Sequence, residues 1–202
     1  MEKIKKLRKI FESEGIDGYI IPKNDEFFGE YVNDHNDRLS YISNFTGSFG
    51  FSLILRNKNY LFVDGRYTLQ ATSQSGKYFK VITFPQIMPK DILKNKKICV
   101  GFDPKLFTRK NLNLFFKNKN LDLKAIDSNL IDKIWKRKTN KKNVKFYRLP
   151  DKTIGKTFKS KIDIIARNLK NKGVDFQFIS SSENTAWLLN IRGNDTEFAP
   201  IP

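Results

Sequence analysis

Hydrophobic and polar positions in the first part of the chain follow periods that predict one helix and then several strands. The helix is marked by apolar residues at helical spacing: Ile4, Leu7, Ile10 and Phe11. Gly15 follows as the expected end of this helix, and a short strand at 17–22 then closes on a proline. Two apolar runs, 51–56 and 60–63, are separated by three polar residues and predict a tight hairpin.

Helices and strands continue to alternate as far as residue 126. One helix is expected to begin directly after Asp64, and another is expected at 108–117. Three more strands are expected, at 78–83, 97–101 and 121–126. The segment that contains Pro85 and Pro89 is expected to be a loop. Alternating strands and helices, together with one hairpin, predict an α/β layer fold with a mixed sheet.

A second amphipathic pattern near the end of the chain indicates an internal repeat. Its apolar residues lie at helical spacing: Phe158, Ile162, Ile165 and Leu169. This helix is expected to end at Gly173 and to be followed by a strand at 174–179. Gly15 and Gly173 lie 158 residues apart in similar contexts, EGIDGYI and KGVDFQF. That distance is too long for a solenoid and fits a duplicated domain, although two unrelated helix–glycine–strand units would give the same pattern.

The repeat predicts a first domain at 1–146 and a partial second domain at 147–202. The second copy of the fold then has 56 residues, against 146 for the first. The sequence therefore predicts a truncated fragment that stops inside its second domain. Either a shortened product or a split or decayed gene would give such a chain.

The most informative motif is the segment YLFVDGRYTLQA at 60–71. An apolar, strand-like run stops at Asp64, whose carboxylate can accept the free amide hydrogens of the following helical turn. Arg66 lies in that turn, where the helix dipole mildly disfavours a cation. Local helix stability therefore does not account for Arg66. It is either a surface arginine without a role or a residue that is used by something outside the helix.

Further segments accompany this motif along the chain: DEFFGEY at 25–31, RLSYISNFTGSFG at 38–50, VGFDP at 100–104, NLIDKIW at 129–135 and NTAWLLNIRGND at 184–195. In their order and separations they resemble the amino-terminal half of the Xaa-Pro aminopeptidases, specifically the long, three-domain aminopeptidase P type. The resemblance spans residues 2 to 202. It implies a mixed-sheet creatinase/prolidase amino-terminal domain, followed by the start of a second copy of the same fold.

The resemblance also implies an activity for the parent protein. That family removes the amino-terminal residue from peptides with proline in second place, using two divalent ions, usually manganese, in a third domain that is absent here. Its implied partners are the rest of the peptidase, a second copy in a homodimer, and the peptide. The arginine of the family's Asp-Gly-Arg-Tyr motif, Arg66 here, contacts bound peptide. Arg192 could border the same cleft but is assigned no role, and Phe27 departs from the family by replacing a histidine.

The residues themselves predict no catalytic or metal site in this chain. Its single histidine, His35, lies in a polar run that favours a surface loop. Ser48 sits between glycine-containing turns like a nucleophile, but only His35 could serve as its base. Gly47 and Gly50 are expected to permit the turn into the following strand. The two tryptophans, Trp135 and Trp187, are expected to be core anchors.

The formal net charge of +17 changes this picture little, because the lysines are spread over nearly every segment. The one dense basic cluster, 136–145, is expected to be a solvated linker. A basic nucleic-acid-binding protein is a less favoured alternative, as is a free-standing interaction module that kept the fold and lost the enzyme. Cys99 lies in an apolar run and is expected to be a small buried residue. With no apolar stretch long enough for a signal peptide or a membrane span, a cytoplasmic location is expected.

Overall fold

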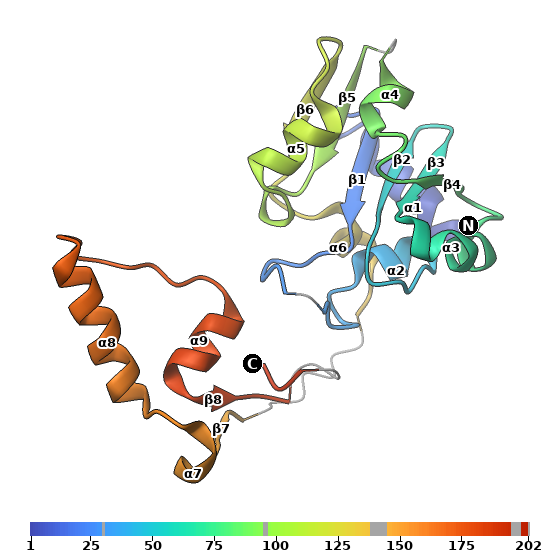
Figure 1. Cartoon of the computed structure of the whole chain (residues 1–202). Coiled ribbons are helices and arrows are strands. Elements are labelled where there is room, and N and C mark those ends of the chain that lie inside the picture. Colours follow the sequence, from blue (N-terminus) through green and yellow to red (C-terminus); the bar gives the residue numbers. More distant parts are fainter. Residues whose placement is uncertain (30, 95–96, 138–144, 195–198, 202) are drawn as a thin grey trace. The chain divides into compact units, whose positions relative to one another are not determined.

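The computed structural model describes residues 1–29, 31–94, 97–137, 145–194 and 199–201 (Figure 1). It divides into two compact units. The first unit comprises Met1–Glu26 and Asp34–Lys138, and the second comprises Phe27–Asn33 and Thr139–Pro202. Each unit is described below on its own.

A six-stranded mixed sheet, with the order β4-β3-β2-β1-β5-β6, forms the centre of the first unit. Its strands are β1 (Gly18–Pro22), β2 (Phe51–Leu55), β3 (Asn59–Val63), β4 (Lys80–Thr83), β5 (Ile98–Phe102) and β6 (Leu121–Ala125). β2 runs antiparallel to both of its neighbours, whereas β1 pairs in parallel with β5, β3 with β4, and β5 with β6. The other five strands therefore all point in one direction. The predicted α/β fold with a mixed sheet is confirmed.

Helices cover both faces of this sheet, which is why its central strands are apolar on both sides. The helices are α1 (Glu2–Phe11), α2 (Arg38–Ser43), α3 (Thr68–Ser75), α4 (Pro89–Leu93), α5 (Arg109–Phe116) and α6 (Leu130–Ile134). Successive strand residues point to opposite faces. Tyr19 and Ile21 pack with apolar residues of α1, α2, α3 and α6, whereas Ile20 packs with those of α4 and α5.

The turn chemistry of the first unit follows the sequence closely. After α1 the chain reverses through Gly15, which has a φ of +61°, and the amide of Ile16 donates to the Phe11 carbonyl at 3.0 Å. Glycine takes this left-handed conformation without strain. β2 and β3 form the predicted hairpin, in which the Leu55 amide donates to the Lys58 carbonyl at 2.8 Å.

One predicted loop of the first unit is partly helical. The segment with Pro85 and Pro89 contains the short helix α4, which begins at Pro89. Proline suits a first helical position, because its missing N–H would have no partner within the helix and its φ is already helical. The side chain of Asp91 accepts from the Met88 amide at 2.8 Å and helps to close this turn. The loop assignment was wrong over α4.

The second unit contains β7 (Tyr147–Arg148), α7 (Asp151–Ile154), α8 (Phe158–Asn171), α9 (Ser182–Leu189) and β8 (Ile191–Arg192). β7 and β8 form a two-stranded antiparallel sheet. α8 is the predicted amphipathic helix, and the chain turns after it through Gly173, whose φ is +61°. The predicted strand at 174–179 is wrong, because no other described segment pairs with it.

Lys161 joins α8 to α9 inside the second unit. Its ammonium group, on a residue only 5% exposed, donates to the Trp187 carbonyl at 2.6 Å and to Asn190 Oδ1 at 2.5 Å. Desolvation lowers the pKa of Lys161. The same ammonium group lies 4.3 Å from the centre of the Trp187 ring. Trp187 is nevertheless 55% exposed, so the prediction of a core anchor was wrong for this residue.

Two further expectations concern the basic segment and membrane crossing. Most of the basic segment 136–145 lies outside the described residues, since 138–144 are not among them. No helix in the described parts of the chain combines the length and the apolar character that a membrane crossing requires.

Candidate functional site

Polar side chains gather where the five strands of common direction end. Glu26 follows β1, Asp64 and Arg66 follow β3, Asp103 follows β5, and Asp127 follows β6. The carboxyl ends of strands that run in one direction lie at the same end of a sheet. In open α/β sheets ligands bind at this end, where the loops that leave the strands converge. We therefore take this end of the first unit as the candidate site.

Asp64 and Arg66 form a closed local ion pair at the end of β3. The Asp64 carboxylate accepts from the Arg66 amide at 2.9 Å and so caps a short 3₁₀ turn, η1 (Gly65–Tyr67), that precedes α3. In the Arg66 guanidinium, Nη2 lies 2.7 Å from Asp64 Oδ2, and Nε lies 3.2 Å from both carboxylate oxygens. The predicted cap is confirmed, although the first turn is 3₁₀ rather than α-helical.

The guanidinium of Arg66 remains accessible despite this pair. Its side chain is 74% exposed, against 23% for that of Asp64. The hydrogen bonds between the two side chains lower the pKa of Asp64 and raise the pKa of Arg66. Only the Nε–Nη2 edge of Arg66 faces Asp64, and Nη1 donates to no other described residue. The Nη1–Nη2 edge therefore offers parallel N–H donors, a geometry that suits a carbonyl or a carboxylate.

The loop before β2 packs beside this arginine. Tyr67 hydrogen-bonds through its hydroxyl to the Ser48 hydroxyl at 2.6 Å, and the edge of its ring meets Phe45 with the ring centres 5.9 Å apart. The guanidinium carbon of Arg66 lies 5.3 Å from the centre of the Tyr67 ring. Arg66 thus lies beside a tyrosine whose ring is fixed by contacts with Phe45 and Ser48.

Side chains of α3 fix the other side of the same loop. The Thr46 amide donates to Gln74 Oε1 at 3.0 Å, and the Thr46 hydroxyl accepts from Gln70 at 3.1 Å and from Gln74 at 3.0 Å. Hydrogen bonds from two glutamines to one threonine restrict the loop's position relative to α3. Because α3 follows η1 directly, the loop that contains Thr46 and the turn that contains Arg66 are both fixed relative to α3.

The fold requires glycine at two of the three motif positions 47, 50 and 65. A Cβ at Gly47 would lie 2.2 Å from the Phe45 ring, and a Cβ at Gly50 would lie 2.9 Å from the Phe62 carbonyl oxygen. Close packing therefore requires both, rather than a positive φ. Gly65 differs, because a Cβ there would meet nothing within 4 Å. The fold does not need glycine at position 65, and the absent side chain leaves open space beside Arg66.

A buried arginine network lies at the same end of the sheet, and the sequence did not reveal it. Arg38, at the start of α2, is 3% exposed and binds Asp132 with Nε and Nη2, each at 2.9 Å. It also donates from Nη2 to Glu26 at 2.8 Å and from Nη1 at 3.3 Å. Arg137 pairs with the same Asp132 carboxylate. Burial disfavours the charged guanidinium, but these carboxylates outweigh that cost and raise the pKa of Arg38.

Next to this network is a shallow polar depression. Its lining residues come from the ends of β1, β5 and β6 and from α6: Glu26, Asp103, Lys105, Asp127, Ser128, Asn129, Asp132 and Lys133. Asp103 and Asn129 are buried and hydrogen-bonded to each other at 2.8 Å, and each also caps its own following helical turn. These contacts give Asp103-Pro104 the turn role that the sequence predicted.

Other residues considered from the sequence lie away from any catalytic arrangement. His35 is half-buried in a turn between β1 and α2, and the Ser48 hydroxyl is paired with Tyr67 rather than with an imidazole. Desolvation raises the pKa of the half-buried Cys99 thiol, which disfavours a nucleophilic thiolate. Trp135 stacks on a tyrosine at the edge of the core, as predicted for an anchor. Arg192 lies in β8 of the second unit and donates to the Ala186 carbonyl at 3.3 Å.

The described residues do not fit a two-ion metal site. No group of three or more histidine, cysteine, aspartate or glutamate side chains in these ranges is placed to hold an ion. The carboxylates of Glu26 and Asp132 are both bound to Arg38. We therefore assign no step of metal chemistry to this chain.

The fold is that of a creatinase/prolidase amino-terminal domain. The model of that family, the Creatinase/Prolidase N-terminal domain, matches residues 3–133, and the chain belongs to this family. A second model with the same description matches residues 136–202.

Among curated proteins, the chain is similar to Xaa-Pro aminopeptidases. It is 30% identical to Xaa-Pro aminopeptidase 1 of Dictyostelium discoideum over 99% of this chain and 35% of that protein. It is 33% identical to a probable Xaa-Pro aminopeptidase P of Pyrenophora teres f. teres, over 98% of this chain and 32% of the other. The chain therefore spans about a third of the length of these relatives. The resemblance seen in the motifs is confirmed.

Solved structures agree with this assignment. An X-prolyl aminopeptidase from Caenorhabditis elegans, described as a cytosolic enzyme with a di-nuclear active site, matches with a TM-score of 0.87 and 29% identity. The match covers 99% of this chain and 36% of that enzyme. The amino-terminal domain of the cytoplasmic peptidase PepQ from Mycobacterium tuberculosis matches 66% of this chain with a TM-score of 0.52 and 22% identity, which bears on the fold alone.

Proposed function

We propose that this chain is the noncatalytic amino-terminal portion of a metal-dependent Xaa-Pro aminopeptidase. Residues 1–146 form its first domain, and residues 147–202 form part of a second domain of the same fold. The chain contributes Arg66 to the cleft in which the parent binds peptide. The rest of the parent would hold the metal ions, proposed to be manganese, that hydrolysis requires. The parent is proposed to be a homodimer.

The observation that carries this proposal is the geometry of Arg66. Its guanidinium is held at one edge by Asp64 and is 74% exposed, which leaves its outer donors available to a group from elsewhere. An arginine with an immobilised inner edge loses less conformational freedom on binding than a fully mobile one. The open space at Gly65 favours the approach of a peptide backbone to the same point.

The proposal can be tested in a chimera. Residues 1–202 of this chain would replace the matched region of the C. elegans X-prolyl aminopeptidase, and kcat/KM would be measured on a short Xaa-Pro peptide. We expect the chimera to cleave the peptide, whereas the 202-residue chain alone does not. Arg66→Ala should lower kcat/KM by about tenfold to a hundredfold, because a contact to the bound peptide is lost.

Arg56 provides a matched control for this substitution. It is also exposed and paired with an aspartate, Asp17, but it follows β2 and therefore lies at the opposite end of the sheet. Arg56→Ala should leave kcat/KM unchanged. Equal kinetics for the Arg66→Ala variant and the parent chimera would reject a peptide contact. A folded chimera without activity would reject the proposal that this chain serves as a peptidase amino-terminal portion.

A further inference from the structure

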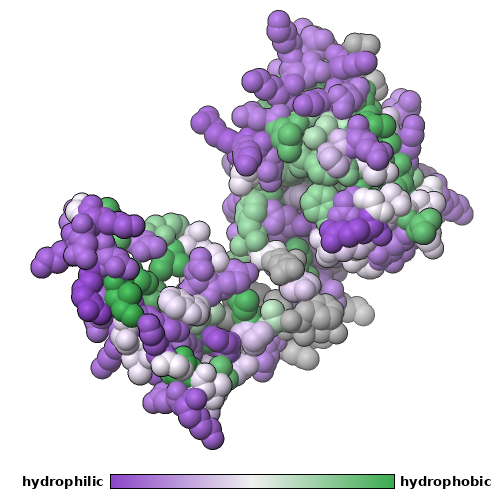
Figure 2. Space-filling view, in the orientation of Figure 1, coloured by the Kyte–Doolittle hydropathy of each residue, from purple (hydrophilic) through white to green (hydrophobic). Residues whose placement is uncertain are grey.

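Two phenylalanines form an aromatic surface at the end of the first unit's sheet that also carries Arg66. Phe49 shortly precedes β2, and Phe84 directly follows β4. Because β2 runs antiparallel to β3 whereas β4 runs parallel to it, both residues lie at the end of the sheet where β3 stops. Figure 2 shows hydrophobic surface among the hydrophilic side chains of this unit. We call Phe49 and Phe84 the aromatic platform.

Buried aromatic rings hold this platform in place. The ring centres of Phe49 and Phe84 lie 5.7 Å apart. Phe84 also meets the rings of Phe51 and Phe115 edge-on, at 5.6 Å and 5.7 Å, and these two residues are only 2% and 9% exposed. Phe49 remains 38% exposed. A partner of the platform therefore meets a preformed surface, which reduces the entropy that is lost on binding.

The backbone of β3 places the platform close to Arg66. The Phe84 amide donates to the Val63 carbonyl at 2.8 Å, which fixes Phe84 beside the last residue of β3. Val63 and Arg66 are three residues apart, so their Cα atoms are separated by at most about 11 Å. An extended peptide advances about 3.3–3.6 Å per residue. About three residues of such a peptide would therefore cover this distance.

The turn between Val63 and Arg66 leaves room for a peptide backbone. A Cβ at Gly65 would meet nothing within 4 Å, so position 65 places no side chain in this space. Phe49 is held near the same turn, because the preceding hydroxyl, that of Ser48, bonds to the Tyr67 hydroxyl at 2.6 Å. The platform and the arginine thus flank an open stretch of backbone.

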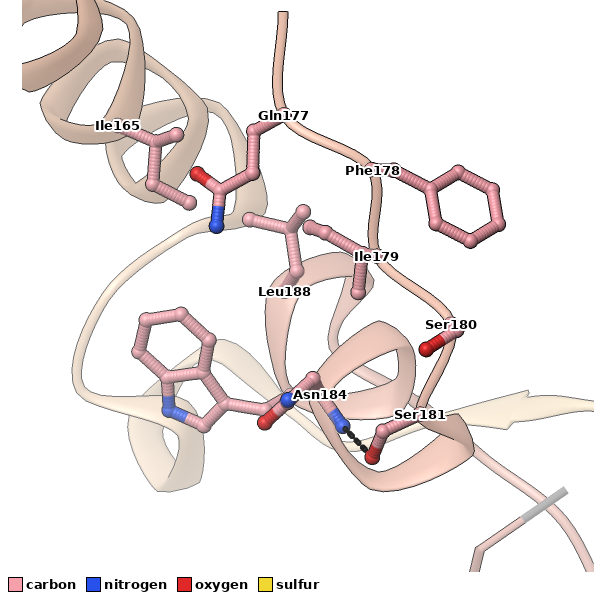
Figure 3. Close-up of a pocket in the computed structure, with 9 residues that line it drawn as sticks. Ile165, Gln177, Phe178, Ile179, Ser180, Ser181, Asn184 and Leu188 are labelled. Carbon is pink, nitrogen blue, oxygen red and sulfur yellow. Dashed lines mark hydrogen bonds between the residues drawn. The ribbon is translucent and has the colours of Figure 1, made fainter. Parts of the chain in front are cut away.

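The hollow of the second unit has an apolar lining without a comparable charge. Figure 3 shows Ile165, Ile179 and Leu188 around this space of about 320 Å³. The residues that line it are all uncharged. Ligand sites combine apolar and aromatic walls with a few polar groups that fix the orientation of the ligand. The aromatic platform and Arg66 provide both parts of such a site.

We propose that the aromatic platform binds the apolar side chain of the residue that follows the proline, while Arg66 holds a backbone acceptor of the same peptide. That the ligand is a peptide rests on the proposed function. The bond to be cleaved joins the first residue to the proline, so the first acceptor beyond it is the proline carbonyl. The next side chain belongs to the third residue. The parent should therefore prefer peptides with an apolar third residue.

The charge of Arg66 favours a peptide over an apolar surface of another domain. A purely apolar partner on the platform would displace water from the neighbouring guanidinium without offering it an acceptor, and burial of an unpaired charge is costly. An apolar residue within a peptide brings both the side chain for the platform and a carbonyl or carboxylate for the arginine.

Kinetics of the chimera with the C. elegans enzyme test the proposal. We would measure kcat and KM for Ala-Pro-Ile and Ala-Pro-Ser. Phe49→Ala should lower kcat/KM for the isoleucine peptide by about fivefold or more, mainly through KM, and that for the serine peptide by less than about twofold. Phe49→Leu keeps an apolar side chain and should retain most of the preference for isoleucine.

Tyr78 provides a matched control for Phe49. It is 40% exposed, but it precedes β4 and therefore lies at the opposite end of the sheet. Tyr78→Ala should leave kcat/KM unchanged for both peptides.

An NMR titration of the 202-residue chain provides a second measurement that does not depend on catalysis. Ala-Pro-Ile should shift the amide signals of Phe49 and Phe84 more than Ala-Pro-Ser does at the same concentration. Phe49→Ala should remove this difference at Phe84.

The failure of this proposal can be told apart from the failure of the proposed function. In an active chimera, Phe49→Ala kinetics that are unchanged, or reduced equally for both peptides, would overturn the platform's role and leave the proposed function intact. An equal reduction would mean that the platform packs against another part of the parent. A folded but inactive chimera would reject the proposed function, and the titration would then decide. Larger amide shifts with the isoleucine peptide would support the platform, whereas identical shifts with both peptides would overturn it.

Discussion

Replacing Arg38 should cost the first unit a large part of its stability. The side chain is 3% exposed and holds two carboxylates, those of Glu26 and Asp132, with four hydrogen bonds of 2.8–3.3 Å. Removing one side of a buried ion pair typically costs about 3–5 kcal/mol, because the remaining charge is left without a partner. Glu26 and Asp132 are 33% and 31% exposed, so water can reach them and reduce this penalty. For Arg38→Met we therefore expect a loss of about 2–4 kcal/mol.

Urea unfolding followed by circular dichroism measures this loss. With a slope of about 2 kcal/mol per molar urea, the midpoint should fall by roughly 1–2 M at unchanged slope. Arg56→Met is the matched control, because its ion pair with Asp17 is exposed and pairs of that kind contribute about 0–1 kcal/mol. Equal midpoints for the two variants would refute the reasoning.

A combined variant separates charge burial from lost packing. Arg38→Met with Glu26→Gln and Asp132→Asn removes Arg38 together with both of its carboxylates and leaves only Arg137 of this network charged. Replacing the members of a buried ion pair together is often nearly neutral. We expect it to recover at least half of the stability lost by Arg38→Met alone. No recovery would mean that the packing of Arg38, rather than its charge, stabilises the site.

Further predictions concern single positions of the first unit and use the same unfolding assay. Ser52 has a buried hydroxyl without a hydrogen-bond partner among the described residues, so Ser52→Ala should be neutral or stabilising by up to about 1 kcal/mol. The buried Ser75 hydroxyl instead donates to a carbonyl at 2.7 Å, so Ser75→Ala should cost about 1 kcal/mol, and the reverse order would contradict this account. Gly47→Ala should lower the unfolding free energy by about 1–3 kcal/mol, because its Cβ would lie 2.2 Å from a phenylalanine ring. Gly65→Ala should leave the urea midpoint unchanged, because its Cβ would meet nothing within 4 Å, but should lower kcat/KM in the chimera. The pKa of Asp17 is lowered chiefly by a backbone hydrogen bond. The stability that its charged form contributes is therefore complete above the unfolded pKa of about 4 and is lost as the pH falls through the lower folded pKa. Asp17→Asn should flatten the pH dependence of the unfolding free energy in this acidic range.

Local patterns were sufficient to predict the six strands of the first unit and three of its helices, α1, α3 and α5, but not α2, α4 or α6. The hairpin of β2 and β3, the left-handed turn at Gly15 and the cap at Asp64 each depend on a few adjacent residues. Such features are encoded by short-range sterics and hydrogen bonds, which a sequence displays directly. The helix α4 was missed because a proline can start a helix as well as interrupt one.

Contacts between distant residues could not be predicted in the same way. Arg38 and Asp132 are 94 positions apart, and only the fold brings their side chains together. The segment 174–179 shows the converse, because its apolar residues predicted a strand from local pattern alone, yet no other described segment pairs with it. Trp187 was expected in a core, yet it is 55% exposed, with the ammonium group of Lys161 near its ring.

The account depends most on the claim that Arg66 reaches a peptide held by another part of the parent enzyme. A crystal structure of the chimera with an uncleaved Xaa-Pro peptide analogue tests this claim directly. We predict that a peptide carbonyl or carboxylate oxygen lies about 2.7–3.2 Å from the outer nitrogens of Arg66 while Asp64 keeps the inner edge. A bound peptide that makes no contact with Arg66, whose guanidinium remains paired with Asp64 alone, would contradict it.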